Sequence, residues 1–300
     1  MFNGTTENNL GGSSNEAWLF NPQTLEWTMA QKVPSGCEWY DPGGVYDSQA
    51  DRFLLYCSGV NGKLYEYDFA ADKWSDRKAA NTPQNAHNTR MAYDAESQKT
   101  ILVGGISFTT PKERFEGTWA YDYTTNAWTK MNPKTQPPGL YQHELVYDSE
   151  SDRVILWAGR VWTGNWGGSW TSDITENLVW AYDYNTDTWE SFPIAGEPNR
   201  PYVGSDFLKY VASVYVSDLD RTIYYWNTNL YAYDLNNNAW EVAKGKIRPA
   251  AGFRKCHGMA YLSSIQRVLV FGGAAEGDFT FPRDTWLYDP QSGDWTKVGP

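Results

Sequence analysis

Long apolar segments are absent from this 300-residue sequence, and no stretch approaches the roughly 20 apolar residues that a membrane-spanning helix needs. We therefore expect no membrane span. Bases are also few, since 25 Lys and Arg stand against 36 Asp and Glu and the formal net charge is −11. Because nucleic acid is a polyanion that prefers a basic surface, this balance argues against a nucleic-acid partner.

Cysteine is scarce as well. The three cysteines, Cys37, Cys57 and Cys256, are odd in number and contain no CxxC spacing. Such a set indicates neither a zinc site nor a disulfide framework. Residues 1–4 (MFNG) contain neither the charged nor the apolar region of a secretory leader, so no signal peptide is predicted.

Aromatic residues, by contrast, make up 16% of the chain, which excludes a disordered polypeptide. Six tryptophans recur at intervals of roughly 50 residues, the length of a propeller blade: Trp27, Trp74, Trp128, Trp189, Trp240 and Trp295. Nine positions before each lies another aromatic residue: Trp18, Tyr65, Trp119, Trp180, Tyr231 and Trp286. Segments such as WAYDYTTNAW and WAYDYNTDTW lie between them, and they predict the same β-hairpin six times.

The turns of these hairpins carry the residue types that turns require. Five of them open with Asp and the first opens with Asn21, whose side chains accept hydrogen bonds from nearby backbone N–H groups. Two positions before the closing Trp are residues that tolerate a positive φ: Asp72, Asn126, Asp187, Asn238 and Gly293. The first hairpin departs from this pattern because it has Leu25 there.

A second hairpin precedes each of the last five. A Tyr ends its first strand, and Arg or Lys follows six residues later, as in Tyr46 and Arg52, or Tyr93 and Lys99. An apolar run such as FLLYC or TILV comes next. Each repeat therefore contains four short strands, called a to d in chain order. Repeated four-stranded units of this length predict an all-β protein, a β-propeller.

The repeats resemble the Kelch family, which includes the central domain of galactose oxidase. The resemblance lies in the glycine pairs after strand b (Gly104-Gly105 and Gly272-Gly273), the Tyr-Asp of strand c and the Trp of strand d. It implies a Kelch-type β-propeller. The sequence pattern of the repeats is similar to that of prokaryotic, often archaeal, Kelch arrays in secreted or surface proteins. That favours an extracellular or cell-surface location, with a cytoplasmic one still open.

We interpret residues 1–300 as a single propeller domain with six blade positions. The approximate units are 1–30, 31–77, 78–131, 132–192, 193–243 and 244–300. Residues 1–4 align with the end of a strand b, so the first unit is expected to lack strand a and most of strand b. We therefore expect the chain to be part of a longer polypeptide.

A resemblance to galactose oxidase would imply a copper site with Tyr and His ligands. The sequence contains no HxH or similar ligand pair, so we predict no metal, no cofactor and no catalytic residue. The expected function is non-enzymatic recognition of a protein segment or a glycan. A copper oxidase-like or epimerase-like enzyme, and a structural spacer in a larger surface protein, stay open as alternatives.

In a propeller the d–a and b–c connections share one face, here the long-loop face, and the a–b and c–d turns share the other, the turn face. Most of the acid excess falls in the turns, whereas the long-loop face is near neutral and carries Arg and aromatic residues. Arg binds carboxylates and aromatic rings supply rigid contact area. The predicted ligand-binding residues around the channel mouth are Trp39, Arg90, Arg114, Tyr141, His143, Arg160, Trp162, Trp166, Trp170, Arg200, Tyr202, Phe253, Arg254, His257 and Arg283.

Two groups in this set have a special position. Trp162, Trp166 and Trp170 lie in one insertion of the fourth unit, RVWTGNWGGSWTSDITEN, which we expect to serve binding rather than the core. His143 and His257 lie five residues before the end of strand a of their units, where the family resemblance also implies a scaffold role.

Overall fold

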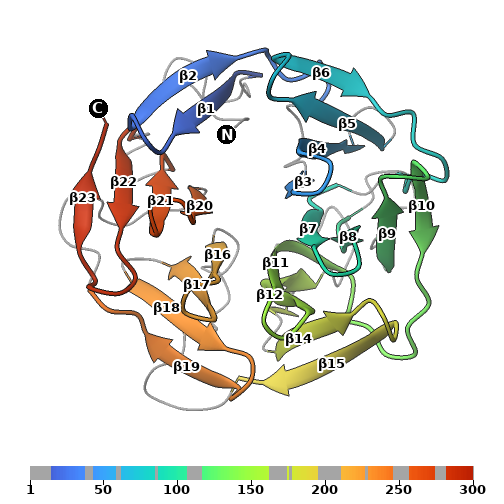
Figure 1. Cartoon of the computed structure of the whole chain (residues 1–300). Helices are drawn as coiled ribbons and strands as arrows, with labels where there is room; N and C mark the ends of the chain where they lie inside the picture. The colour runs from blue at the N-terminus through green and yellow to red at the C-terminus, as the bar shows by residue number, and fades with distance from the viewer. Residues whose placement is uncertain are drawn as a thin grey trace, which may run out of the picture.

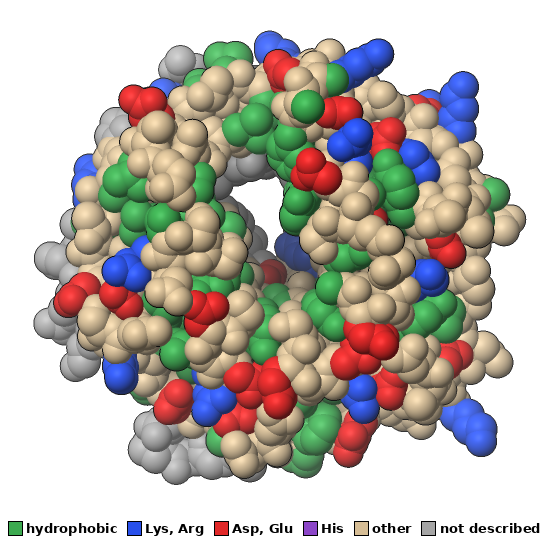
Figure 2. Space-filling model, viewed as in Figure 1, with side chains coloured by type: hydrophobic (Ala, Val, Ile, Leu, Met, Phe, Trp, Pro, Cys, Tyr) green, Lys and Arg blue, Asp and Glu red, His purple; other side chains and the backbone are tan. Residues whose placement is uncertain are grey.

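The computed structural model describes residues 15–37, 43–58, 62–84, 87–106, 117–161, 174–175, 178–194, 211–226, 229–245, 257–273 and 282–299. These residues form six antiparallel β-sheets around a central channel (Figures 1 and 2). They include no α-helix. Within these ranges, accordingly, there is no helix of the length and apolarity that crossing a membrane requires.

Blade 1 has two strands, β1 (Ala17–Asn21) and β2 (Glu26–Ala30). Blade 2 has β3 (Gly43–Asp47), β4 (Arg52–Cys57), β5 (Lys63–Asp68) and β6 (Lys73–Asp76). Blade 3 has β7 (Arg90–Asp94), β8 (Lys99–Val103), β9 (Thr118–Asp122) and β10 (Ala127–Lys130). Blade 4 has β11 (Leu140–Asp148), β12 (Arg153–Val161), β13 (Ile174–Thr175), β14 (Leu178–Asp183) and β15 (Thr188–Pro193). Blade 5 has β16 (Ala212–Val216), β17 (Arg221–Trp226), β18 (Asn229–Asp234) and β19 (Ala239–Val242). Blade 6 has β20 (Gly258–Leu262), β21 (Arg267–Phe271), β22 (Thr285–Tyr288) and β23 (Trp295–Lys297).

Within each complete blade the strands pair in chain order, and the first strand lies beside the channel while the last lies on the outside (Figure 1). In blade 1, β1 and β2 occupy the two outer positions, next to β22 and β5 of the neighbouring blades (Figure 1). The predicted fold is confirmed. It is an all-β propeller with five full blades, and a sixth position holds a small two-stranded sheet.

The hairpin turns are stabilised as the sequence predicted. Asp122, for example, accepts hydrogen bonds from the backbone N–H groups of Thr124 and Thr125 at 2.8 and 3.1 Å. The residue two positions before each closing Trp has a positive φ of 45° to 86°, and this includes Leu25 at 60°. A Tyr hydroxyl completes several of these turns by donating to the residue five positions later, as Tyr121 does to Asn126 at 2.8 Å.

An ion pair that the repeats share joins the two hairpins of each complete blade. The base that opens strand b lies beside the Asp that ends strand c. Four such N–O distances are 2.8 to 3.3 Å: Arg52–Asp68, Lys99–Asp122, Arg153–Asp183 and Arg221–Asp234. The fifth, Arg267–Asp289, is 2.9 Å. The sequence marked both partners as recurrent, and strand pairing explains why they meet.

Aromatic packing between blades forms the core, as expected for the strand tryptophans. Trp157 of β12 lies 4.6 Å from the ring of Tyr224 and 4.9 Å from that of Trp240, both in blade 5. The indole N–H of Trp189 reaches back to blade 3 and donates to Thr118 Oγ1 at 2.8 Å. These tryptophans therefore hold neighbouring blades together.

The expectation that the cysteines form no disulfide is wrong for one pair. Cys37 and Cys57 are bonded, with their Cα atoms 4.8 Å apart, and both are fully buried. They are 20 residues apart in sequence, and the d–a connection after blade 1 brings Cys37 back to the end of β4. Spacing along the chain could not show this approach.

Candidate functional site

Six of the fifteen predicted binding residues are described by the structure: Arg90, Tyr141, His143, Arg160, His257 and Arg283. The other nine lie outside the described residues: Trp39, Arg114, Trp162, Trp166, Trp170, Arg200, Tyr202, Phe253 and Arg254. The six belong to blades 3, 4 and 6.

Blade 4 extends farther toward the long-loop face than the other complete blades. Strands β11 and β12 each have nine residues, whereas strands a and b elsewhere have five or six. The short strand β13 pairs with the end of β12, Arg160 with Thr175 and Val161 with Ile174. The predicted insertion therefore begins as an extension of the sheet. Deleting residues from 161 onward would remove Val161, which is a buried strand residue.

Tyr141 and Arg160 lie in this extension. We expected them in connections, but they face each other across β11 and β12 as a cross-strand pair. The guanidinium carbon of Arg160 is 5.9 Å from the centre of the Tyr141 ring, and both side chains are buried. A cation held over an aromatic ring in this way stabilises the extended hairpin. The pair is thus built into the blade wall.

Arg90 is the first residue of β7 rather than a loop residue, and it joins a polar chain along the inner strands. Its Nε lies 3.7 Å from Glu144 Oε1 on β11, and Ser213 of β16 donates to Glu144 Oε2 at 2.8 Å. Three successive blades are therefore linked through one carboxylate beside the channel. Arg90 and Glu144 keep 25% and 14% of their side-chain surface exposed, so a ligand in the channel mouth could still contact them.

His143 is fully buried between two glycines. A Cβ atom on Gly104 would lie 2.7 Å from the His143 ring, and one on Gly159 would lie 2.7 Å from its Cβ. Burial, and secondarily the charge of Arg90, lowers the pKa of His143 to about 3. This imidazole stays neutral and packs blade 4 against blade 3, which is the scaffold reading of the position.

His257 and Arg283 are both in blade 6. The His257 ring lies 4.2 Å from that of Tyr225 in blade 5 and is buried, so it too acts between blades. Arg283 is exposed and precedes β22 on the long-loop face. Of the six described candidates, it is the one whose side chain is mostly open to solvent.

On the turn face, carboxylates are used within the protein. Carboxylate oxygens of Asp94, Glu96 and Asp152 lie within 4.8 Å of one another, and Asn185 donates its amide to Glu96 and Asp152 at 3.1 and 3.2 Å. Blade 5 repeats the arrangement, since Asn236 donates to Glu150 and Asp220 at 2.7 and 3.1 Å. Burial raises the pKa of Asp94. Figure 2 shows acidic side chains at several places around the ring on one face.

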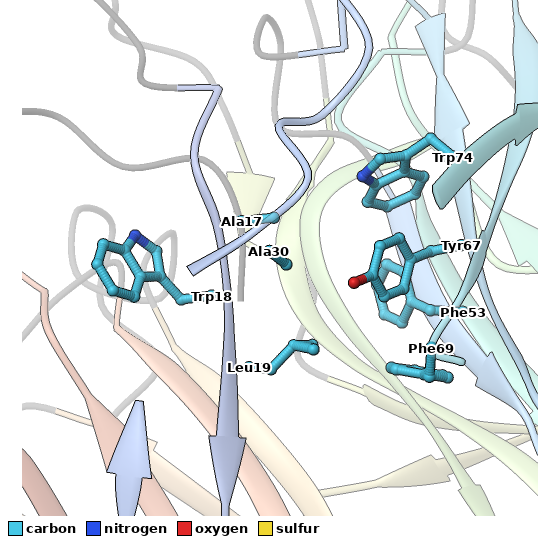
Figure 3. A pocket seen from close by; sticks show the side chains of 8 residues that line it. All are labelled: Ala17, Trp18, Leu19, Ala30, Phe53, Tyr67, Phe69 and Trp74. Atoms are coloured by element: carbon cyan, nitrogen blue, oxygen red, sulfur yellow. The ribbon is translucent and has the colours of Figure 1, made fainter. Parts of the chain in front are cut away.

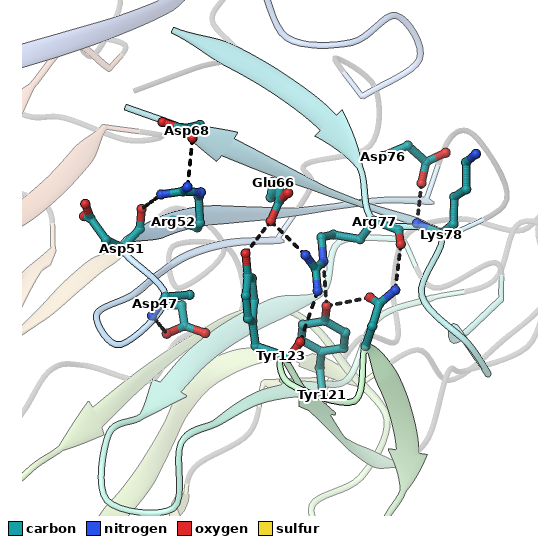
Figure 4. Close-up of polar contacts among 12 residues, drawn as sticks. Asp47, Asp51, Arg52, Glu66, Asp68, Asp76, Arg77, Lys78, Tyr121 and Tyr123 are labelled. Carbon is teal, nitrogen blue, oxygen red and sulfur yellow. Dashed lines mark hydrogen bonds and ion pairs between the residues drawn. The ribbon is translucent and has the colours of Figure 1, made fainter. Parts of the chain in front are cut away.

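A polar cluster that the sequence analysis missed joins blades 2 and 3 (Figure 4). Arg77 donates to the Tyr121 hydroxyl at 3.0 Å and pairs with Glu66 at 3.2 Å, and its guanidinium lies 4.1 Å from the Tyr123 ring centre. Tyr123 donates its hydroxyl to Glu66 at 2.7 Å. Arg77 lies three residues after Trp74, where the other units have an apolar residue (Ala30, Met131, Phe192, Ala243 and Val298), so no repeat pattern pointed to it.

The geometry defines a class of protein. Four-stranded antiparallel units repeat around a channel, with a glycine pair after strand b, Tyr-Asp in strand c and an inter-blade Trp in strand d. This is a Kelch-repeat β-propeller.

Comparison with known proteins agrees. A family profile described as the KLHDC2/KLHL20/DRC7 Kelch-repeats domain matches residues 98–300, and the chain belongs to that family. Kelch propellers are typically protein-interaction modules and are usually non-catalytic.

Individual relatives match over parts of their length. "Dynein alpha chain, flagellar outer arm" of Chlamydomonas reinhardtii is 23% identical over 222 residues, which cover 66% of this chain and 5% of that protein. "Kelch domain-containing protein 10" of Xenopus tropicalis is 31% identical over 85 residues, which cover 27% of this chain and 17% of that protein. These matches lend no support to the expected resemblance to prokaryotic arrays or to galactose oxidase, nor to carbohydrate binding or an extracellular location.

Proposed function

We propose that this propeller is a non-enzymatic module that binds an extended segment of a partner protein on its long-loop face, beside the channel mouth at blades 3 and 4. The observation that carries the proposal is the extension of β11, β12 and β13 beyond the repeat. A regular blade folds without these residues. Because ordering them costs conformational entropy, their presence favours a binding function at that face.

The opposite face offers less for a ligand of this kind. Its turn carboxylates accept backbone N–H groups, pair with the base of strand b or accept the amide of a neighbouring Asn. A face with this excess of carboxylates repels a peptide that itself presents carboxylates. The long-loop face carries the Arg90–Glu144 pair, which is mostly buried but partly open to solvent, at blades 3 and 4, and the exposed Arg283 at blade 6. Such a mixture suits a peptide that presents both carboxylates and hydrogen-bonding backbone.

The test begins with selection of 12-residue peptides from a random phage-displayed library against the whole chain, with a glycan array in parallel. The most enriched peptide is then synthesised, and its Kd is measured by biolayer interferometry. A variant in which Asn-Gly replaces residues 162–173 keeps β12 and β13 paired, because Val161 and Ile174 face each other and Asn-Gly closes a two-residue hairpin. We expect it to bind at least about tenfold more weakly with an unchanged melting temperature.

A matched pair of charge reversals locates the face. Arg90→Glu, beside the blade 4 extension on the long-loop face, should weaken peptide binding, whereas Lys73→Glu at an exposed turn-face position should leave it unchanged. Equal effects of the two substitutions would contradict a binding site on the long-loop face. Enrichment of glycans but no peptide would replace the protein-segment proposal with a carbohydrate one, and a stoichiometric copper content in purified protein would favour the enzyme alternative.

A further inference from the structure

An apolar cavity lies between blade 1 and blade 2 (Figure 3). Its volume is about 80 Å³, and it is lined by Ala17, Trp18, Leu19, Ala30, Phe53, Tyr67, Phe69 and Trp74. Leu19 comes from β1 of blade 1, and the aromatic residues other than Trp18 come from blade 2. In Figure 3, Leu19 and the rings of Tyr67 and Phe69 point into the same space.

Phe69 marks where this cavity opens. It is 39% exposed, whereas the other residues that line the cavity are buried or only partly exposed. Phe69 is the first residue after β5, so the opening lies at the turn end of blade 2. Its ring is 5.3 Å from the buried Tyr67 ring and 5.9 Å from the Tyr46 ring. An exposed aromatic pair thus leads from the surface to the cavity.

Tyr46 is far more exposed here than its counterpart in the next blade. It is 47% exposed, whereas Tyr93 is 8% exposed. Burial, followed by the Asp47 carboxylate of the preceding blade, raises the pKa of Tyr93 to about 12, so that ring is covered by its neighbour's turn. Apolar surface is therefore open at this place in blade 2 and covered at its counterpart in blade 3.

The surroundings of the opening are negative. Asp68 and Asp72 flank Phe69 in the turn, and their hydrogen bonds lower both pKa values, so both stay ionised at neutral pH. Asp51 lies at the Tyr46 hydroxyl, which donates to it at 2.8 Å. Arg52 neutralises Asp68 in part. An apolar cavity ringed by carboxylates fits an apolar side chain that is carried on a basic peptide.

We propose that this cavity is a second docking site, distinct from the long-loop face, for a partner polypeptide that inserts one aliphatic side chain between neighbouring Lys or Arg residues. The anchor is of leucine size, because a cavity of about 80 Å³ holds an isobutyl group more readily than an aromatic ring. Tyr46 and Phe69 supply contact area at the opening, and the carboxylates select the basic flanks. The proposal does not rest on the function proposed above.

The probe is a fluorescein-labelled peptide, acetyl-KRGLGKR-amide, titrated with the whole chain and followed by fluorescence anisotropy. We expect saturable binding that weakens as salt rises from 50 to 300 mM, because the flanking charges are screened (a Debye length of roughly 10 Å at 0.1 M). The same peptide with Ser in place of Leu should bind at least about tenfold more weakly, since it loses the buried isobutyl group. Binding that does not saturate, or that is equal for the two peptides, would overturn the proposal.

Two variants of the protein locate the site. Ala30→Leu fills the cavity with the same group that the peptide would insert, so it should abolish Leu-dependent binding while the melting temperature stays equal or rises. Phe69→Ser removes the partly exposed ring at the opening of the cavity, and it serves as the second variant if Ala30→Leu fails to fold. The matched control is Met29→Ser, an exposed apolar position on the outer strand of blade 1. Equal loss in Met29→Ser and Phe69→Ser, or unchanged binding in both, would mean that the peptide binds elsewhere.

Discussion

The indole N–H of Trp27 donates a hydrogen bond to Oγ1 of Thr285 at 2.8 Å, across 258 residues of chain. The same pair of atoms meets at the same distance between two consecutive blades, where the indole N–H of Trp189 in blade 4 donates to Oγ1 of Thr118 in blade 3. Trp27 is in blade 1 and Thr285 in blade 6, so the ring closes through a contact that continuous blades also make. The ring of Trp27 also lies 4.8 Å from that of Phe271.

Replacing the Thr in each contact tests the closure. Thr118→Val leaves a buried indole N–H without its acceptor and should lower the free energy of unfolding by about 1–3 kcal/mol. Thr285→Val should cost less, about 1 kcal/mol, because Trp27 is only half-buried and water can replace the hydroxyl. Denaturant titrations of both variants give the comparison. An equal or larger loss for Thr285→Val would mean that the closing contact contributes more to the free energy of unfolding than the exposure of Trp27 indicates.

The repeated base–Asp pairs should differ in strength with the burial of the acid. Asp234, whose side chain is 7% exposed, loses its partner in Arg221→Gln, and we expect a loss of about 1–3 kcal/mol. Asp68 is 31% exposed, so Arg52→Gln should cost at most about 1 kcal/mol. Urea unfolding at neutral pH measures both. The same cost in both variants would contradict a role for burial.

His143 should make stability depend on pH. The folded protein keeps this imidazole neutral down to pH about 3, whereas in the unfolded chain it titrates near its ordinary value of 6.5. Between these values the unfolded state binds the extra proton, so stability is full above pH 6.5 and falls as pH falls. The limiting slope is about 1.4 kcal/mol per pH unit. Unfolding free energies at pH 6.5 and 5.0 should differ less in His143→Gln than in the parent.

The two buried carboxyl groups of Asp94 and Asp148 act in the opposite direction and set the range of that experiment. Burial raises the pKa of Asp94 and of Asp148 in the folded state, so protonating them favours folding as pH falls toward their values. The unfolding free energies are therefore compared at pH 5 and above, where fewer of these carboxyl groups are protonated. Parallel pH profiles for the parent and His143→Gln would show that the imidazole is not the group responsible.

The Cys37–Cys57 disulfide closes a loop of 20 residues and holds the connection after blade 1 to β4. For a loop of that size the double variant Cys37→Ala, Cys57→Ala should lose about 3 kcal/mol. Thiol titration in denaturant should find one free thiol without reductant and three after reduction. Cys256→Ser is the control, in which the titration should find no free thiol without reductant and two after reduction. Three free thiols before reduction would contradict the bond.

The sequence by itself determined the repeat. Six hairpins with fixed Trp spacing, turn Asp and Asn residues at their required positions, and a base at the start of each strand b are local patterns, and local chemistry suffices to specify strands and turns. From them the propeller, its six positions and its incomplete first unit were predicted correctly. The pairing of Arg221 with Asp234 follows from the same regularity, because both residues recur in every complete unit.

Only the tertiary structure decided the departures from that regularity. Cys37 meets Cys57, Arg77 meets Glu66 and Tyr121, and Tyr141 lies against Arg160 in a hairpin longer than the repeat. The cavity between blades 1 and 2 opens at Phe69, beside the exposed ring of Tyr46. Each of these depends on which segments become neighbours when the blades close into a ring. A single sequence contains no periodic signal for a contact that occurs once, so it could fix the blades but not what meets between them.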